Sequence, residues 1–157
     1  MSDPSIRPYR PGDEPQICGV IKACFEEYGF TWEPDDYNSD TTDVQANYID
    51  PGGWFWVMEE GDEIIATVGL MPEGNGACEL WRMYLNADYR GKRLGYRLLD
   101  FIVAFAREQG FDRMDIWSDV KLIDAHRLYR KYGAEFIGQR ICDDPDRSLE
   151  NGYIMPL

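Results

Sequence analysis

The stretch Asp88-Tyr89-Arg90-Gly91-Lys92-Arg93-Leu94-Gly95-Tyr96-Arg97-Leu98-Leu99 decides how the rest of the chain is interpreted. A run typical of a β-strand, residues 79–85, comes before it. Apolar residues after it recur at the spacing of one helix face, and they are Leu94, Leu98, Phe101, Ile102 and Phe105. The sequence therefore predicts a strand, a short turn containing glycine, and a helix that begins near Leu94.

This predicted turn has the features of an anion-binding site. The first turn of a helix leaves backbone N–H groups unpaired, and the helix dipole favours negative charge there. Basic residues crowd the same place, where each ordinarily costs a few tenths to about 1 kcal/mol; they are Arg90, Lys92, Arg93 and Arg97. A bound phosphate would reverse that cost, and a solvated basic loop is the alternative. The phosphate motifs G-x-x-x-x-G-K-[ST] and G-x-G-x-x-G are both absent.

Two segments together resemble the motifs of the GCN5-related N-acetyltransferases, the GNAT superfamily. Arg90-Gly91-Lys92-Arg93-Leu94-Gly95 is similar to the family's Q/R-x-x-G-x-G/A acyl-CoA loop. Further on, Ala125-His126-Arg127-Leu128-Tyr129-Arg130-Lys131-Tyr132-Gly133-Ala134 is similar to its A-x-x-L-Y-x-x-x-G-F segment. Three positions depart from the pattern: Arg93 replaces the middle glycine, Leu122 replaces a common asparagine, and Ala134 replaces Phe.

The resemblance implies one GNAT domain over residues 1–157. Its fold would be α+β (mixed α/β), with a central mixed sheet of six to seven strands flanked by about four helices. The two central parallel strands, residues 79–85 and 113–117, would splay to admit the pantetheine arm of the cofactor. The order of predicted elements, a meander followed by a crossover helix, a strand, a helix and a hairpin, also favours a mixed sheet flanked by helices.

The local patterns predict the individual elements. Strands are expected at residues 5–10, 54–59, 63–70, 79–85, 113–117, 135–142 and 152–157. Helices are expected at residues 14–28, 94–109 and 122–132. Residues 30–50 are expected to be irregular or to contain a short helix near residues 41–48.

For the cofactor, acetyl-CoA, the resemblance implies contacts from two segments. The loop and the first turn of its helix would bind the cofactor through Arg90, Gly91, Lys92, Arg93, Leu94, Gly95 and Tyr96. The preceding strand would lend backbone groups to the pantetheine amides at Met83, Tyr84 and Leu85.

Transfer of an acetyl group to an amine needs a general acid, and Tyr129 is the candidate. The amine must lose a proton, the thioester carbonyl must be polarised, and the leaving thiolate must be protonated. Tyr129 matches the family's tyrosine, which points at the thioester sulfur. A phenol with a pKa of about 10 is protonated at neutral pH and is able to donate. The alternative is a core tyrosine packed by its ring.

Glu79 is the candidate general base. Its place before the loop resembles that of the catalytic glutamate of histone-acetylating family members. Strand alternation would put Glu79, Trp81, Met83 and Leu85 on one face, where burial would raise the pKa of the carboxyl. The alternative is a charge at a strand end in solvent. The single histidine, His126, is interpreted as a surface or capping residue.

Composition and charge exclude several function classes. The net charge of −13 disfavours nucleic acid as a partner and favours a cationic one. A run of 18 apolar residues is absent, so no membrane partner is expected. Four scattered cysteines and one histidine predict no metal site. The first residues lack the pattern of a signal peptide, so the expected location is cytoplasmic, and a homodimer is left open.

The segment from residue 25 to residue 50 predicts the class of acceptor. It combines aromatic and acidic residues, and it contains no Lys or Arg. Carboxylates would attract a protonated amine and aromatic faces would bind it, so we expect a small or peptidic cationic amine as substrate. A solvated acidic loop is the alternative for this segment. For the whole chain, the alternative to an N-acetyltransferase is a non-catalytic acyl-CoA-binding regulatory or interaction module.

Overall fold

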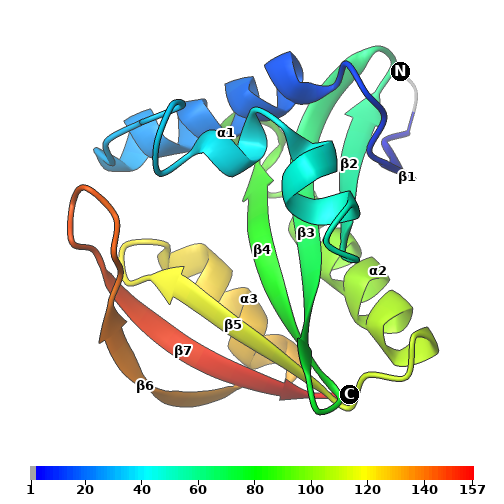
Figure 1. Cartoon of the computed structure of the whole chain (residues 1–157), viewed down its shortest axis with the longest axis vertical. Coiled ribbons are helices and arrows are strands. Elements are labelled where there is room, and N and C mark those ends of the chain that lie inside the picture. The colour runs from blue at the N-terminus through cyan, green and yellow to red at the C-terminus, as the bar shows by residue number, and fades with distance from the viewer. Residues whose placement is uncertain (1–2) are drawn as a thin grey trace.

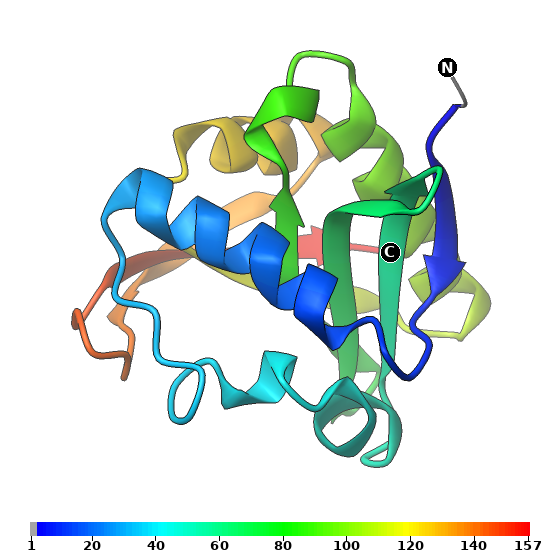
Figure 2. The same ribbon diagram turned by 90° about the horizontal axis from the view of Figure 1, so that it is seen from above.

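A computed structural model describes residues 3–157 (Figure 1). Its centre is a seven-stranded sheet with the strand order β1-β2-β3-β4-β5-β7-β6. Helix α1 and the turns that follow it cover one face of the sheet, and helices α2 and α3 cover the other (Figure 2). The predicted α+β class and mixed sheet are confirmed.

The elements follow the predicted order closely. The strands are β1 (Ser5–Pro8), β2 (Trp54–Glu60), β3 (Glu63–Gly74), β4 (Ala77–Leu85), β5 (Arg113–Asp119), β6 (Glu135–Ile141) and β7 (Leu149–Pro156). The α-helices are α1 (Glu14–Tyr28), α2 (Leu94–Glu108) and α3 (Ile123–Tyr132). The short helix expected near residues 41–48 is instead a 3-10 turn at Ser39–Thr41 and a π-helical turn at Gln45–Ile49.

Two apolar cores lie on opposite faces of the sheet. The larger joins α2 to the sheet through side chains such as Leu98, Leu99 and Ile102, which are almost fully buried. The smaller joins α1 to the sheet through Ile17 and Ile21, with the adjoining turns packed against it. Burial of apolar surface contributes about 25 cal/mol per Å² to the free energy of folding, and burial on both faces holds the sheet between its helices.

The two parallel strands of the sheet separate partway along their length. β4 and β5 pair only where Ala77–Glu79 lies beside Arg113–Asp115. Beyond that point β4 stays paired with β3, and β5 stays paired with β7. Beyond that point, the facing edges of β4 and β5 do not pair with each other. Their backbone N–H and C=O groups are therefore open to another hydrogen-bond partner. The predicted splay is confirmed (Figure 1).

A β-bulge at Arg82 interrupts β4. Gly69 of β3 lies opposite Trp81, whereas Thr67 lies opposite Tyr84, so β4 carries one extra residue. Arg82 takes a left-handed backbone conformation with φ of 50°, and the Thr67 hydroxyl donates a 2.8 Å hydrogen bond to its carbonyl. Such a bulge puts consecutive residues on the same face of the sheet.

The bulge corrects one prediction about β4. Met83 and Leu85 pack against the core of α2 and α3, whereas Tyr84 packs against the core of α1. Strict alternation from Glu79 through Trp81 to Met83 is therefore wrong, because the extra residue resets the alternation. The same reset turns the Arg82 side chain toward Tyr37 and Asp40 on the α1 face.

Candidate active site

Two clefts open beside the gap between β4 and β5. The first, here called the helix cleft, is lined from α1, β4, the loop before α2, α2 and α3. The second, the strand cleft, is lined from the end of α1 and the turn after it, β4, β5 and the β6–β7 connection. Met83, Tyr84, Leu122 and Tyr129 line both clefts and mark their junction.

Tyr129 lies at this junction. Helix α3 carries it, and its side chain is 4% exposed, with its ring near those of His126 and Tyr153. Burial raises the pKa of the Tyr129 phenol well above its ordinary value, and Tyr84 and Tyr153 add to the shift. The hydroxyl therefore keeps its proton at neutral pH.

The predicted loop forms one end of the helix cleft. Arg90 and Gly95 are among the residues that line it. Gly91 and Arg93 both take left-handed backbone conformations, with φ of 79° and 63°, and α2 begins directly after them without a side-chain cap on its first amides. Leu94 is buried in the core, so only its backbone can serve a ligand. The Lys92 and Arg93 side chains lie over the rings of Tyr89 and Tyr96.

Arg90 is tied to helix α1. Its Nη1 donates to the Glu27 carboxylate at 2.6 Å, and its Nη2 lies 3.4 Å from the Leu85 carbonyl. All three predicted strand residues, Met83, Tyr84 and Leu85, line the same cleft as Arg90. The structure thus brings both predicted cofactor segments to one cleft.

Glu79 lies at the last paired position of β4, opposite Asp115 of β5. It is not among the residues that line either cleft. Burial raises the pKa of its carboxyl, and the charge of Asp115 adds to the shift, whereas Glu73 and Arg140 oppose it. Burial also raises the pKa of neighbouring Glu73 to about 8, with Asp115 and Glu79 contributing. Direct contact between Glu79 and an acceptor in the strand cleft is not part of this geometry.

The aromatic part of the predicted acceptor segment does line the strand cleft, through Phe25, Phe30 and Tyr37. The acidic part does not. The carboxylates that line this cleft come from β5 and from the β6–β7 region, and they are Asp119, Asp144 and Glu150. The sequence showed no signal for them, because strand pairing across the sheet brings them to the cleft.

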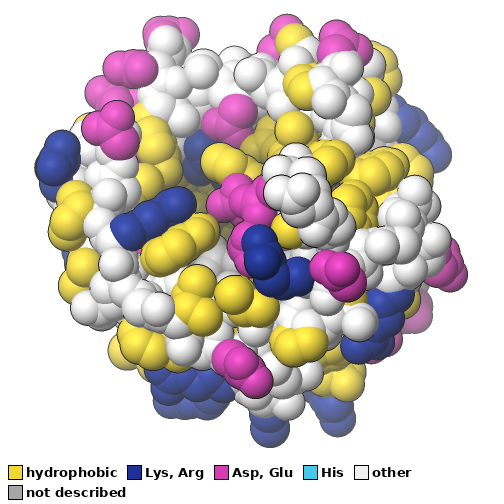
Figure 3. Space-filling model, turned by 60° about the horizontal axis from the view of Figure 1, so that its bottom comes forward, with side chains coloured by type: hydrophobic (Ala, Val, Ile, Leu, Met, Phe, Trp, Pro, Cys, Tyr) yellow, Lys and Arg dark blue, Asp and Glu magenta, His cyan; other side chains and the backbone are white. Residues whose placement is uncertain are grey.

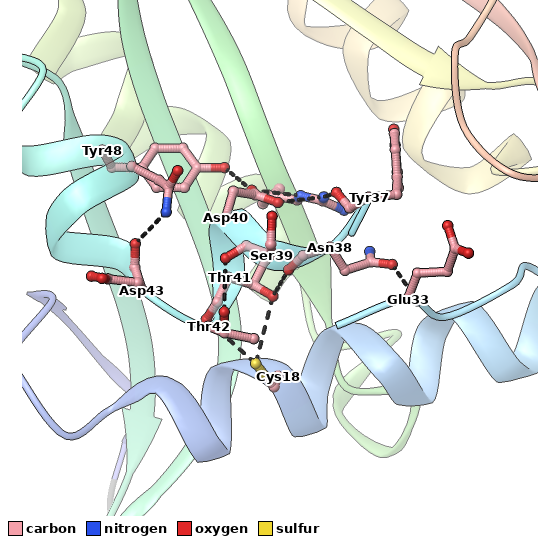
Figure 4. Close-up of polar contacts among 12 residues, drawn as sticks. Cys18, Glu33, Tyr37, Asn38, Ser39, Asp40, Thr41, Thr42, Asp43 and Tyr48 are labelled. Atoms are coloured by element: carbon pink, nitrogen blue, oxygen red, sulfur yellow. Dashed lines mark hydrogen bonds and ion pairs between the residues drawn. The ribbon is translucent and has the colours of Figure 1, made fainter. Parts of the chain in front are cut away.

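The acidic segment contains no Lys or Arg, but cations from elsewhere in the chain neutralise part of it. Arg90 from the loop pairs with Glu27. Arg82 from β4 pairs with Asp40, its Nε at 3.0 Å from Oδ2 and its Nη2 at 2.8 Å from Oδ1. The Tyr48 hydroxyl also donates to Asp40 (Figure 4). Sequence reasoning missed Arg82, whose partners are distant in the chain.

Two segments that contribute residues to the strand cleft also contact each other. The Thr31 backbone N–H and hydroxyl both donate to the Asp146 carboxylate at 2.7 Å. The Tyr37 hydroxyl lies 3.2 Å from the Cys142 sulfur. These contacts join the turn after α1 to the β6–β7 connection. Figure 3 shows one face of the molecule, hollowed near its centre, with hydrophobic, acidic and basic side chains around the hollow.

His126 is buried, which corrects its interpretation as a surface or capping residue. It is 6% exposed, its Nδ1 lies 3.3 Å from the Asn151 amide, and its Nε2 has no hydrogen-bond partner within residues 3–157. The inner face of α3 packs on β5 and β7, and helical spacing from Tyr129 could not reveal that burial. Desolvation lowers the pKa of the imidazole.

Comparison with known proteins identifies the family. The model of the acetyltransferase (GNAT) family matches residues 19–134. The chain belongs to the GNAT family. The resemblance seen in its two motifs is confirmed, and the chain is accordingly an acetyl-CoA-dependent N-acetyltransferase whose acceptor is an amine.

Relatives and solved structures agree with this assignment. The uncharacterized N-acetyltransferase YjgM of Escherichia coli is 33% identical over 80% of this chain and 78% of its own length. N-acetyltransferase 8B of Rattus norvegicus is 29% identical over 65% of this chain, which spans about half of that longer relative (49%). A GNAT acetyltransferase from Staphylococcus aureus superposes with a TM-score of 0.87 at 24% identity, over 99% of both chains. A GNAT structure from Elizabethkingia anophelis, solved with acetyl-CoA bound, superposes with a TM-score of 0.73 at 15% identity, over 100% of both.

Residues 3–157 contain no group of three or more His, Cys, Asp or Glu side chains arranged to hold a metal ion. No helix in that same range is long and apolar enough to cross a membrane.

Proposed function

We propose that this GNAT enzyme holds acetyl-CoA in the helix cleft and transfers its acetyl group directly to a primary amine in the strand cleft. The observation that carries the proposal is the position of Tyr129, which lines both clefts. A residue at that junction can contact the thioester from one side while the amine approaches from the other.

For the cofactor, we propose that the backbone amides at the start of α2 bind the pyrophosphate. The left-handed conformations of Gly91 and Arg93, and the uncapped first turn of α2, support this assignment, since free amides and the helix dipole attract an anion. Arg90, Lys92, Arg93 and Tyr96 would border the phosphates, and Leu94 and Gly95 would contribute backbone groups. The free edge of β4 at Met83, Tyr84 and Leu85 would pair with the pantetheine amides.

For the chemistry, the neutral amine attacks the thioester carbonyl, a C–N bond forms, and the C–S bond breaks. Tyr129 donates its phenolic proton to the departing thiolate, a role that its raised pKa supports because the group is fully protonated at neutral pH. We propose that Glu79 accepts the amine proton through intervening water, since it lies on β4 just outside the clefts. Its raised pKa makes it a better base than an ordinary exposed carboxylate.

For the acceptor, we propose a small or peptidic amine that is cationic in solution. Asp119, Asp144 and Glu150 line the strand cleft and would attract a protonated amine. Phe25, Phe30, Tyr37 and Trp117 line the same cleft, and their faces would hold an ammonium by cation–π attraction of about 0.5–2 kcal/mol.

Substitution of Tyr129 by Phe tests the proposal. The Tyr129→Phe enzyme should keep its fold and its affinity for acetyl-CoA, while kcat falls by roughly ten- to a thousandfold, the scale of a lost general acid. Calorimetric binding of acetyl-CoA and steady-state rates over a panel of amines supply the two readouts. Tyr153→Phe is the matched control, because this tyrosine packs beside Tyr129 but lines neither cleft. An unchanged kcat in Tyr129→Phe, with the chemical step limiting, removes Tyr129 from the mechanism.

A further inference from the structure

Arg82 is the one cation among the residues that line the strand cleft. Its side chain is only 7% exposed, so it is held away from bulk water. The bulge in β4 fixes its direction, and the rings of Tyr37 and Phe25 lie 5.3 and 6.0 Å from its guanidinium carbon. A buried arginine with this much support holds a single orientation, which is what a recognition group requires.

The guanidinium is only partly satisfied within the protein. Nε and Nη2 form the edge that pairs with Asp40, and Nη2 also donates to the Tyr37 carbonyl at 3.3 Å. Nη1 takes no part in these three hydrogen bonds. The Tyr84 hydroxyl is a neighbour of the guanidinium: burial raises the pKa of this phenol, whereas the charge of Arg82 and a hydrogen bond with its side chain oppose that rise. An arginine has five N–H donors and no acceptor, so the two donors on Nη1 can bind an oxygen from outside the chain.

Charge decides which kind of oxygen fits. Asp40 already neutralises the guanidinium, and Tyr48 in turn donates to Asp40 (Figure 4). Nη1 therefore remains a hydrogen-bond donor on a charged group, but the group needs no second counter-charge. Either a neutral carbonyl oxygen or a carboxylate oxygen can accept its hydrogen bonds. A simple alkylamine offers no such acceptor and would displace solvent from Nη1 without replacing its hydrogen bonds.

The position of Arg82 sets the distance between this oxygen and the reacting amine. The next two residues, Met83 and Tyr84, line both clefts and so lie where acetyl transfer would occur. One strand residue spans about 3.3 Å, so an oxygen at Arg82 lies only a few bonds from an amine at the junction.

We propose that the strand cleft accepts an α-amino carbonyl compound, which can be an amino acid, an amino-acid amide or a peptide N-terminus. An oxygen of its carboxylate, amide or peptide group accepts a hydrogen bond from Arg82 Nη1. The proposal rests on the function proposed above, because it takes the strand cleft to be the acceptor site. It narrows the class of acceptor from amines in general to amines that carry a carbonyl or carboxylate group on the α-carbon.

Three matched acceptors test it: phenylalanine amide, phenylalanine and 2-phenylethylamine. All share the aromatic side chain, and only the first two carry the oxygen. With saturating acetyl-CoA, and with kcat/KM expressed per unprotonated amine, at least one of the two oxygen-bearing acceptors should exceed 2-phenylethylamine tenfold or more. The amide and the acid distinguish a neutral carbonyl from a carboxylate as the preferred partner.

The variant Arg82→Lys gives the second arm. Lysine keeps a cation beside Asp40 but loses the fork that presents Nη1, so the preference for the oxygen-bearing acceptor should fall to within about threefold of unity. The ratio between variant and wild type cancels the different amine pKa values of the acceptors. Arg113→Lys is the control, since Arg113 is half exposed, pairs with Asp115 and lines neither cleft, and it should leave the preference intact.

The outcomes separate the two proposals. If wild-type enzyme acetylates 2-phenylethylamine as efficiently as both oxygen-bearing acceptors, the role of Arg82 is overturned and the proposed function stands. If acetyl-CoA binds but none of the three amines is acetylated, the α-amino carbonyl assignment fails, and a wider amine panel with Tyr129→Phe judges the proposed function by itself. The comparison of the three acceptors uses wild-type enzyme alone, so it tests the inference even if Arg82→Lys does not fold.

Discussion

The helix cleft and the strand cleft meet at Tyr129 but are lined by different kinds of chemical group. The helix cleft is lined mainly by apolar side chains and by the backbone of β4 and the loop, with Arg90 and Asp124 as its charged residues. The strand cleft is lined by several aromatic rings, three carboxylates and the buried cation Arg82. Backbone groups and a helix terminus suit an anionic cofactor, whereas side chains of several chemical kinds suit selection among acceptors.

This contrast also separates the energetic roles of the two clefts. Arg82 and Asp40 form a charge pair that both fills the wall of the strand cleft and ties β4 to the turn at Ser39–Thr41. In the helix cleft, the corresponding pair of Arg90 and Glu27 is more exposed and joins the loop to α1. Damage to the strand cleft should therefore cost stability, and damage to the helix cleft should mainly cost ligand affinity.

The largest expected effect comes from Asp40→Ala. This change leaves the Arg82 guanidinium buried without its counter-charge, and breaking such a pair costs about 3–5 kcal/mol. Urea unfolding should show that loss. Asp36→Ala is the control, because Asp36 is an exposed residue of the same segment whose side chain makes no hydrogen bond within residues 3–157, and it should change stability by no more than about 0.5 kcal/mol. Equal losses in the two variants would show that the pair does not stabilise the wall.

The two clefts also differ in how much of them the sequence predicts. In the helix cleft, the wall from Met83 to Gly95 follows from neighbouring segments of the chain, since a glycine-bearing loop before an amphipathic helix encodes its own geometry, although α1 and α3 also contribute residues. The strand cleft joins residues as far apart as Phe25 and Glu150, and strand pairing brings them together. The bulge at Arg82 lacks any glycine or proline that would announce it, so the face on which Arg82 lies was not predictable.

The next effect tests the helix cleft through Gly95→Val. A Cβ at Gly95 would lie 3.5 Å from Leu128 Cδ2, an ordinary contact, so the fold should persist while the branched side chain enters the cleft. We expect the Kd for acetyl-CoA to rise tenfold or more, which is about 1.4 kcal/mol. Calorimetry measures it.

Gly19→Val is the matched control for this prediction. Gly19 is also a helical glycine, has open space around it and lines neither cleft. It should leave stability unchanged or raise it slightly, because valine is a better helix former than glycine, and it should not change the affinity for acetyl-CoA. If Gly95→Val binds acetyl-CoA as tightly as Gly19→Val, the cofactor does not approach α2 at Gly95.

A smaller effect concerns the pH dependence of stability through His126. Burial lowers the pKa of its imidazole in the folded state, and the charge of Arg130 lowers it further, although Asp119 opposes both. The unfolded chain therefore binds a proton as pH falls below about 6.5, while the folded chain holds the ring neutral to lower pH. Stability supplied by the neutral ring is full above that pH and declines below it, by at most about 1.4 kcal/mol per pH unit.

His126→Gln isolates this contribution, because the chain has a single histidine. The difference in unfolding free energy between wild type and variant should stay constant above pH 7 and shrink steadily from pH 6.5 to pH 5. Carboxylates titrate equally in both proteins and cancel in the difference. A difference that does not change with pH would mean that the imidazole has the same pKa in the folded and unfolded chains, as a ring that reaches water would.

The smallest effect tests the loop backbone by itself. Arg93 adopts φ of 63°, a left-handed conformation that costs a residue with a side chain about 1–2 kcal/mol and costs glycine nothing. Glycine loses about 0.5–1 kcal/mol through its greater freedom when unfolded, so Arg93→Gly should be neutral or stabilising by up to about 1 kcal/mol.

Arg97→Gly removes the same side chain within the helical part of α2, where glycine costs about 1 kcal/mol. The two substitutions remove equal charge near one helix terminus, so thermal unfolding without ligand should shift in opposite directions only if backbone conformation governs the result. Destabilisation of similar size in both variants would show that Arg93 stabilises the loop through its side chain, for instance through its stacking on Tyr96, more than its conformation strains it.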